Sequence, residues 1–364
     1  MNIHTDERIV LTLDAGGTNF VFSAIQKGKA ITREITKNAH PNDLEKCIAT
    51  MKEGFAELIT LLDQKPAAIS FAFPGPADYP NGIIGDLNNL PAFRGGVPLK
   101  PILEEEFGLP VYINNDGDLY AYGEALGGIL PEINTELESA GSPKRYNNLV
   151  GLTLGTGFGG GLVRNGDLFI GDNSTAAEVW LFSNRYGTNV NAEDLVSTRS
   201  VQRVYAELAL LDYPNELMPK DIYNIAVGKT EGNKEAALAA YRETGRALGD
   251  TVANLFTFID GIIVIGGGIT GARDLYMPAV MEELASHYHP SNTDQLPRLV
   301  QRIFNLDNHQ DSEAFYKDYS KEIPVPGTHK KVTYDPMPRL AIATSRIGAS
   351  QAIALGAYAF ALNQ

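Results

Sequence analysis

Apolar residues in this chain recur in short runs whose spacing changes between the period of a strand and the period of a helix. Two apolar runs, 11–13 and 19–25, flank a turn with glycines and predict a β-hairpin. Helical spacing follows over about 42–63. Further patterns come in the order strand, helix, strand and helix, over 68–73, 98–107, 111–113 and 116–126. This alternation predicts an α/β fold.

A second hairpin is predicted near the middle of the chain, where the apolar residues 152–154 run into glycines and apolar sequence resumes at Leu162-Val163. A third glycine cluster, Gly266-Gly267-Gly268, ends the buried-strand pattern of 262–265. Glycine lets the backbone approach a ligand closely, and successive turn N–H groups form a concave anion site. Because ligands of open α/β sheets bind at strand ends, these turns predict phosphate binding.

Two other interpretations of the glycines are disfavoured. The spacing Gly155-x-Gly157-x-x-Gly160 matches the dinucleotide fingerprint, but that fingerprint must open a helix, and here strand sequence follows. No Walker lysine follows either glycine loop, which argues against a P-loop enzyme. For any single turn, a purely structural corner is the alternative.

Two stretches lack a clear period. Residues 131–148, with Pro, Ser, Asn and charges, predict a surface insertion, and residues 305–338, with several prolines, predict an atypical loop or lid. The segment 348–360 is rich in small residues and predicts a helix suited to close packing.

Length and charge limit the class of protein. At 364 residues the chain favours two domains. Its 30 Lys and Arg against 44 Asp and Glu give a net charge of −14, which disfavours nucleic acid and anionic membranes as partners. The first residues lack a basic region and an apolar core, and no apolar run approaches the ~20 residues that span a bilayer. A single cysteine, Cys47, excludes an internal disulfide, and these features together predict a cytoplasmic protein.

Six motifs in a fixed order carry a resemblance to a known family. They are Leu13-Asp14-Ala15-Gly16-Gly17-Thr18, Pro74-Gly75-Pro76, Asn88-Asn89-Leu90-Pro91, Asn114-Asn115-Asp116, the glycine loop 155–161, and Ile265-Gly266-Gly267-Gly268. With these motifs the chain resembles the ROK family of sugar kinases, within the actin-like kinase superfamily. The resemblance implies two actin-like (ribonuclease H-like) α/β domains, 1–122 with about 346–364 and 123–345, with a nucleotide and sugar cleft between them. It also implies ATP and Mg²⁺ as cofactors, with a homodimer left open.

The resemblance implies that Asp116 is the general base. Phosphoryl transfer to a sugar hydroxyl needs a proton acceptor, and Asp116 stands between a strand and a helix N-terminus. The alternative is that Asp116 or Asp118 only caps the helix. The implied sugar contacts are Asn89, Asn115, Asp116, Glu178 and Glu193. An amide suits vicinal hydroxyls, whereas a turn role is the alternative for Asn88-Asn89, and the two glutamates rest on the resemblance alone.

The implied nucleotide contacts lie on the three glycine clusters and are Asp14, Gly16, Gly17, Thr18, Gly155, Thr156, Gly157, Gly267 and Gly268. Asp14 ends the first strand, and the resemblance implies that it approaches Mg²⁺ through water. One carboxylate is sufficient, because Mg²⁺ keeps phosphates and waters as its other ligands. A turn aspartate is the alternative.

The chain departs from the family after Glu178, where Trp180-Leu181 replaces the usual Gly-His pair and no cysteine ligands follow. We therefore expect no zinc site. The function that these residues favour is ATP-dependent phosphorylation of a hexose, with glucose and its 6-hydroxyl as the first choice. The alternatives are a sugar-binding or regulatory member with weak or no turnover, and a kinase for another sugar such as fructose or an N-acetylhexosamine. Asn115-Asp116 argues against a further alternative, an acyl-phosphate kinase.

Overall fold

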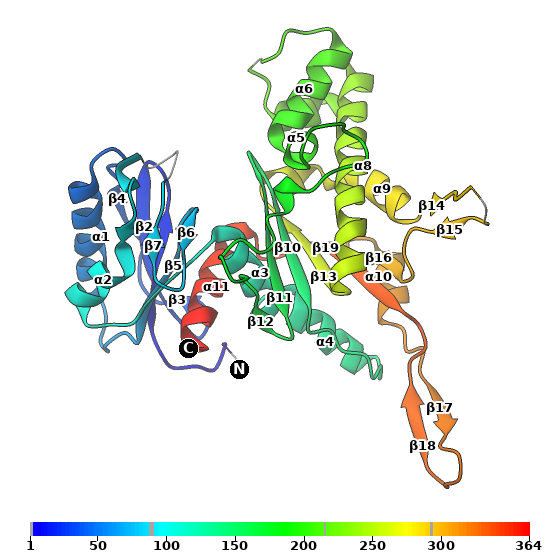
Figure 1. Cartoon of the computed structure of the whole chain (residues 1–364), viewed down its shortest axis with the longest axis horizontal. Coiled ribbons are helices and arrows are strands. Elements are labelled where there is room, and N and C mark those ends of the chain that lie inside the picture. Colours follow the sequence, from blue (N-terminus) through cyan, green and yellow to red (C-terminus); the bar gives the residue numbers. More distant parts are fainter. Residues whose placement is uncertain (1–2, 87–90, 215, 292–293) are drawn as a thin grey trace. The chain divides into compact units, whose positions relative to one another are not determined.

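The computed structural model describes residues 3–86, 91–214, 216–291 and 294–364, which separate into two compact units (Figure 1). The first unit comprises Met1–Gly128, Gly161–Ala176 and Ile347–Gln364, and the second comprises Ile129–Gly160 and Ala177–Arg346. The boundaries differ from the predicted ones in two respects, because the first unit continues to Gly128 rather than residue 122 and the segment 161–176 also belongs to it. Sequence patterns did not indicate this return of the chain, since the change of unit falls inside a strand.

The first unit is built on a mixed sheet in the order β3-β2-β1-β5-β9, with β4 paired to β2. Its strands are β1 (Val10–Ala15), β2 (Asn19–Gln26), β3 (Lys29–Ala30), β4 (Ile35–Asn38), β5 (Ala68–Ala72) and β9 (Val111–Asn114). The predicted hairpin is present, because β1 and β2 pair antiparallel, while β1, β5 and β9 are parallel. A small second sheet holds β6 (Ala77–Asp78), β7 (Ile83–Ile84) and β8 (Val97–Pro98).

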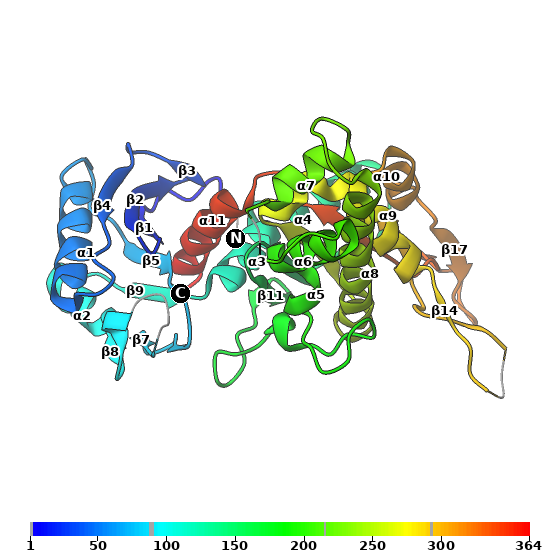
Figure 2. The ribbon, with the colours of Figure 1, turned by 90° about the horizontal axis from the view of Figure 1, so that it is seen from above.

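Helices cover both faces of this sheet (Figure 2). They are α1 (Leu44–Ile59) and α2 (Leu99–Phe107) on one face, and α3 (Asp116–Leu126) and α11 (Ala349–Leu362) on the other, with a short 3₁₀ turn η1 at Pro91–Phe93. Phenylalanines fill the space under α1, and the rings of Phe22 and Phe55 meet edge to face at 5.1 Å between centroids. A Cβ on Gly123 or Gly356 would overlap the backbone of the facing helix, so α3 and α11 pack at close range through these glycines.

The second unit is built on four parallel strands in the order β10-β13-β19-β16. They are part of a six-stranded sheet with the order β12-β11-β10-β13-β19-β16. Strand β11 (Phe158–Arg164) crosses the boundary between the units, and β12 (Asp167–Leu168) lies in the segment 161–176 of the first. The strands of the second unit are β10 (Leu149–Leu154), β13 (Ile262–Gly266), β16 (Arg302–Asn305) and β19 (Arg339–Thr344). Its helices are α4 (Ile129–Ser139), α5 (Glu193–Val196), α6 (Thr198–Ala209), α7 (Pro219–Ala226), α8 (Lys234–Ile259), α9 (Arg273–Leu284) and α10 (His309–Tyr316), with 3₁₀ turns η2 (Val179–Leu181) and η3 (Gly268–Ala272). All five residues of β13 are buried, as its unbroken apolar run predicts.

Two predictions of irregular structure, for residues 131–148 and 305–338, are wrong. Helix α4 begins at Ile129 and buries Ile129, Ile133 and Leu137 on one stripe. Pro131 does not prevent the helix, because it falls in the first turn, where a helix tolerates proline. Residues 305–338 contain α10, which is N-capped by Asn308, and a hairpin of β17 (Lys321–Pro324) and β18 (Lys331–Tyr334). A further short hairpin pairs β14 (His287–Tyr288) with β15 (Leu296–Pro297).

None of the helices within the described ranges is both long enough and apolar enough to span a bilayer.

Candidate active site

The register of the parallel strands brings the candidate carboxylates of the first unit to one edge of its sheet. Asp14 lies opposite Ala72 between β1 and β5, and Ala72 lies opposite Asn114 between β5 and β9. The carboxyl ends of the three strands are therefore level, and Asp116 follows two residues after Asn114 at the start of α3. This is the edge at which α/β sheets bind their ligands.

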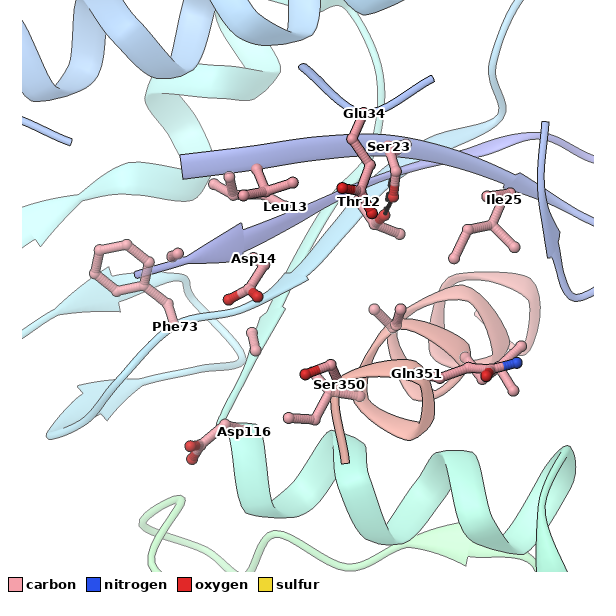
Figure 3. A pocket seen from close by; sticks show the side chains of 18 of the residues that line it. Thr12, Leu13, Asp14, Ser23, Ile25, Glu34, Phe73, Asp116, Ser350 and Gln351 are labelled. Carbon is pink, nitrogen blue, oxygen red and sulfur yellow. Dashed lines mark hydrogen bonds between the residues drawn. The ribbon is translucent and has the colours of Figure 1, made fainter. Parts of the chain in front are cut away.

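A pocket of about 880 Å³ opens at this edge within the first unit (Figure 3). Its wall includes both candidate carboxylates, Asp14 and Asp116, together with Gly17 of the first glycine turn. The other side is formed by α11, including Ser350 and Gln351. The two carboxylates are exposed side chains, so both are open to a ligand.

The start of α3 shows which residue caps the helix. Asn115 is the N-cap, and its Oδ1 accepts a hydrogen bond from the Gly117 N–H at 2.8 Å. Asp116 Oδ1 accepts from the same N–H at 2.9 Å. The capping role that was the alternative for Asp116 thus belongs to Asn115, and Asp116 lies in the first turn, where the helix dipole favours a negative charge.

Tyr79 was not indicated by the sequence. Its hydroxyl donates to the Phe73 carbonyl at 2.9 Å and lies 3.5 Å from Asn115 Nδ2. The amide of Asn115 is therefore oriented by two neighbours, Tyr79 and Gly117, rather than left to rotate. No local spacing connects Tyr79 with Asn115, because the contact joins different strands and loops.

The first glycine turn divides into a constrained and an open position. A Cβ on Gly16 would come within 2.9 Å of the Asn19 carbonyl oxygen, so the fold itself restricts that residue. A Cβ on Gly17 would meet nothing within 4 Å. Thr18 is exposed, and its carbonyl accepts from the Ala39 N–H at 2.9 Å, which fixes the exit of the turn.

The second glycine turn, 155–157, lies in the second unit and is held from both sides by α5 and α6. Thr198 donates to the Gly155 carbonyl through both its N–H and its hydroxyl, each at 2.8 Å. Glu193 Oε2 accepts from the Phe158 N–H at 3.0 Å, and a Cβ on Gly157 would stand 3.0 Å from that same oxygen. This turn is a fixed backbone structure.

Both oxygens of Glu193 are engaged. While Oε2 binds the glycine turn, Oε1 pairs with Arg199 at 2.6 Å. Glu178, the other implied sugar contact of this unit, precedes the 3₁₀ turn η2 and accepts a hydrogen bond from the indole N–H of Trp180. Asn89 lies outside the described residues.

The third glycine cluster adjoins the second. Gly266 lies opposite Thr153 in the β10–β13 ladder, and Gly267 has a φ of +93° with no room for a Cβ beside the Leu154 carbonyl. Gly268 is exposed, and a Cβ there would meet nothing within 4 Å. Gly267 is thus required by the fold, whereas Gly268 and the exposed Thr156 are accessible.

The loop that follows Glu178 is anchored by a buried ionic cluster. Arg298 forms ion pairs with Asp250 of α8 and Glu283 of α9, and all three side chains are at most 5% exposed. The loop contributes Arg185, whose Nη1 lies 3.1 Å from Glu283 Oε1 and whose N–H donates to Asp250 at 3.0 Å. Asn184 Nδ2 also donates to the Ala247 carbonyl at 2.7 Å.

Within the described ranges, no three His, Cys, Asp or Glu side chains gather closely enough to hold a metal ion. For Mg²⁺ the relevant donor is Asp14 alone, and an exposed carboxylate beside an open glycine turn fits an ion that keeps most of its waters and phosphate ligands.

Two α/β units with glycine turns at their strand ends are typical of the actin-like kinase fold, and comparisons with known proteins agree. The ROK family model matches residues 10–305. The crystal structure of a glucokinase from Parabacteroides distasonis is 49% identical, covers 100% of both chains and has a TM-score of 0.92. A Thermotoga maritima glucokinase is 24% identical over 78% of this chain and 89% of its own. An N-acetyl-D-glucosamine kinase of Vibrio cholerae is 29% identical over 72% of this chain and 85% of its own.

The chain belongs to the ROK family.

Proposed function

We propose that this protein transfers the terminal phosphoryl group of ATP to a hexose, with glucose as substrate and its 6-hydroxyl as acceptor. The observation that carries the proposal is the pair Asp14 and Asp116 on the wall of one pocket, at the level carboxyl ends of parallel strands. Relatives named glucokinase support the choice of sugar.

In this proposal Asp116 accepts the proton of the attacking hydroxyl. Its exposed carboxylate lies in the first turn of α3, and one of its oxygens is already oriented by the Gly117 N–H at 2.9 Å. General-base catalysis needs such a carboxylate held at the hydroxyl before the reaction, and it contributes typically about 10²–10⁴-fold to the rate. Asn115 has the donor and acceptor groups to hold neighbouring hydroxyls in place.

The nucleotide contacts proposed are the open positions of the glycine turns. Gly17, Thr156 and Gly268 are exposed, and neither Gly17 nor Gly268 has an atom of the protein where a Cβ would be, so phosphate oxygens can approach their backbone N–H groups. Bound Mg²⁺-ATP would supply the phosphoryl group, with the metal reducing the charge on the phosphates. Asp14 would orient the hydrated ion, and Glu178 and Glu193 remain proposed sugar contacts.

A second candidate substrate is an N-acetylhexosamine. The observation that favours it is the relative named N-acetyl-D-glucosamine kinase, which is 29% identical. Trp180-Leu181 stands where the family has Gly-His, so the contacts around the sugar ring differ from the usual set. A cytoplasmic location is part of the proposal, because the single cysteine is buried and unpaired, as in proteins of a reducing compartment.

The test is a coupled assay of ADP production with ATP over a panel of hexoses and N-acetylhexosamines. We expect the highest kcat/KM with glucose, and a higher value with N-acetylglucosamine would support the second candidate. If the protein binds a sugar of the panel but produces no ADP with any of them, the result would favour the regulatory alternative over an enzyme.

A further inference from the structure

The two glutamates of the second unit lie on either side of one closed loop. At the neck of the loop 183–191 the Ala192 N–H donates to the Phe182 carbonyl at 2.9 Å, and an antiparallel bridge continues the pairing into the loop. Glu178 comes before this neck, and Glu193 follows directly after it. Closure of the loop therefore brings together two carboxylate-bearing segments that are separated in the sequence.

Both segments are held against the first residues of β11, which belong to the second unit. Val179 is fully buried, and a Cβ on Gly160 would stand 2.9 Å from the Val179 Cγ2, so the turn after Glu178 packs closely on this strand. Glu193 Oε2 accepts from the Phe158 N–H of the same strand at 3.0 Å. One strand thus positions the backbone of both segments.

The two carboxylates differ in what they leave for a ligand. Glu193 uses Oε2 for the glycine turn and Oε1 for its ion pair with Arg199. Glu178 uses Oε2 to accept from the indole N–H of Trp180, and among the described residues its Oε1 has no partner. Because Glu178 is only partly buried, this second oxygen is able to accept a hydrogen bond from a ligand hydroxyl.

Trp180 restricts the direction of that second oxygen. The indole and the carboxylate are joined across the turn η2, which is closed by the Leu181 N–H donating to the Glu178 carbonyl at 3.1 Å. A hydrogen bond to an ionised carboxylate is about twice as strong as one between neutral groups. A carboxylate that is held at one oxygen before the ligand arrives also loses less side-chain freedom on binding.

We propose that Trp180 is a positioning residue for the sugar, whose indole N–H holds Oε2 of Glu178 so that Oε1 accepts a hydrogen bond from a hydroxyl of the bound hexose. The inference rests on the proposed function, because it takes Glu178 as a sugar contact. The second glycine turn is held by Glu193 and Thr198 instead. A change at Trp180 should therefore weaken sugar binding and leave nucleotide binding intact.

Trp180 is the single tryptophan of the chain, so the intrinsic tryptophan fluorescence reports on this residue alone. Titration of the wild type with glucose, without ATP, should change the emission with the same dissociation constant that calorimetry gives. The same comparison is made with N-acetylglucosamine. An emission that stays constant while calorimetry shows the protein to be saturated with sugar would overturn the proposal.

The variant Trp180→Phe removes the N–H and keeps an aromatic ring. Loss of a hydrogen bond to a charged group should raise the KM for glucose about tenfold. The kcat and the KM for ATP should be unchanged, because the bond is made equally in the ground and transition states. Leu181→Ala is the matched control on the same turn, and since Leu181 is 58% exposed it should leave all three constants unchanged.

A double-mutant cycle tests whether Trp180 acts through Glu178. Trp180→Phe/Glu178→Ala should bind glucose no more weakly than Glu178→Ala alone, since the N–H then has no carboxylate to hold. Additive losses would overturn the positioning role. So would an unchanged KM for glucose in Trp180→Phe, or an equal rise in the KM for ATP.

The inference and the proposed function fail in different ways. Turnover of glucose that is unaffected by Trp180→Phe would overturn the inference alone. Sugar binding that changes the fluorescence of Trp180 without any ADP production would overturn the proposed activity and support the inference. If neither glucose nor N-acetylglucosamine binds in calorimetry, both are overturned.

Discussion

Replacement of Arg298 by methionine should destabilise the second unit more than any surface substitution. Arg298 is the cation between the Asp250 and Glu283 carboxylates, and the three side chains are 3%, 5% and 4% exposed. Methionine fills the space of the arginine stem, and among the described residues it leaves the two buried carboxylates with the partly exposed Arg185 as their cation. Removing one partner of a buried ion pair costs about 3–5 kcal/mol, and we expect the free energy of unfolding to fall by that amount.

The effect should extend to the second glycine turn. Arg185 belongs to the loop that leads into Glu193, and Glu193 holds the Phe158 N–H at 3.0 Å. In Arg298→Met the loosened loop should therefore weaken nucleotide binding and raise the KM for ATP. Arg199→Gln removes the partner of Glu193 at the other end of this loop and leaves the buried cluster intact.

Urea unfolding followed by circular dichroism measures the free energy of unfolding, and isothermal calorimetry measures the affinity for nucleotide. The triple variant Arg298→Met/Asp250→Asn/Glu283→Gln removes the uncompensated charges and should recover part of the lost stability. A loss below about 1 kcal/mol in Arg298→Met, the size expected of an exposed ion pair, would refute the reasoning. A triple variant no more stable than the single one would also contradict it.

Three further results are expected. Gly17→Ala should leave the melting temperature unchanged, because its Cβ meets nothing within 4 Å, but should weaken nucleotide binding in calorimetry, and unchanged affinity would leave Gly17 as a structural turn only. Dialysis against a chelator should not lower the melting temperature, and stoichiometric zinc in metal analysis would contradict this expectation. Burial raises the pKa of Cys47 to about 12, so the native thiol should resist Ellman's reagent near neutral pH until the chain is denatured, and rapid reaction of the folded protein would show that the thiol is accessible.

Local sequence signals were sufficient for the main strands of the first sheet and for β10, β11 and β13 of the second, whereas β16 and β19 were not predicted. The apolar run at Ile262–Ile265 predicted β13, and the pairing of β1 with β2 follows from two apolar runs around a short turn. The helix α4 was missed because proline and polar residues obscured its stripe of Ile129, Ile133 and Leu137. The hairpin of β17 and β18 was missed because all its strand residues are exposed, so burial imposes no simple alternation on the sequence.

The candidate site divides in the same way. Asp14 and Asp116 could be placed at strand ends from the sequence. Asp14 directly follows the apolar residues 11–13, and Asp116 follows the apolar residues 111–113 after two asparagines. Tyr79, Thr198 and Arg298 could not be found, because each acts on residues that are distant in sequence and no spacing records the contact. The engagement of Glu193 by Arg199 and by the glycine turn depends equally on tertiary structure.

The kinetic effect of Asp116→Asn tests the account most directly. The change keeps the size and the hydrogen-bonding capacity of the side chain but removes the proton acceptor. With the preferred sugar, kcat for ADP production should fall by about 10²–10⁴-fold, and the affinity for the sugar should change little. Retention of more than about a tenth of the wild-type kcat, well short of that loss, would contradict the role of Asp116 as general base.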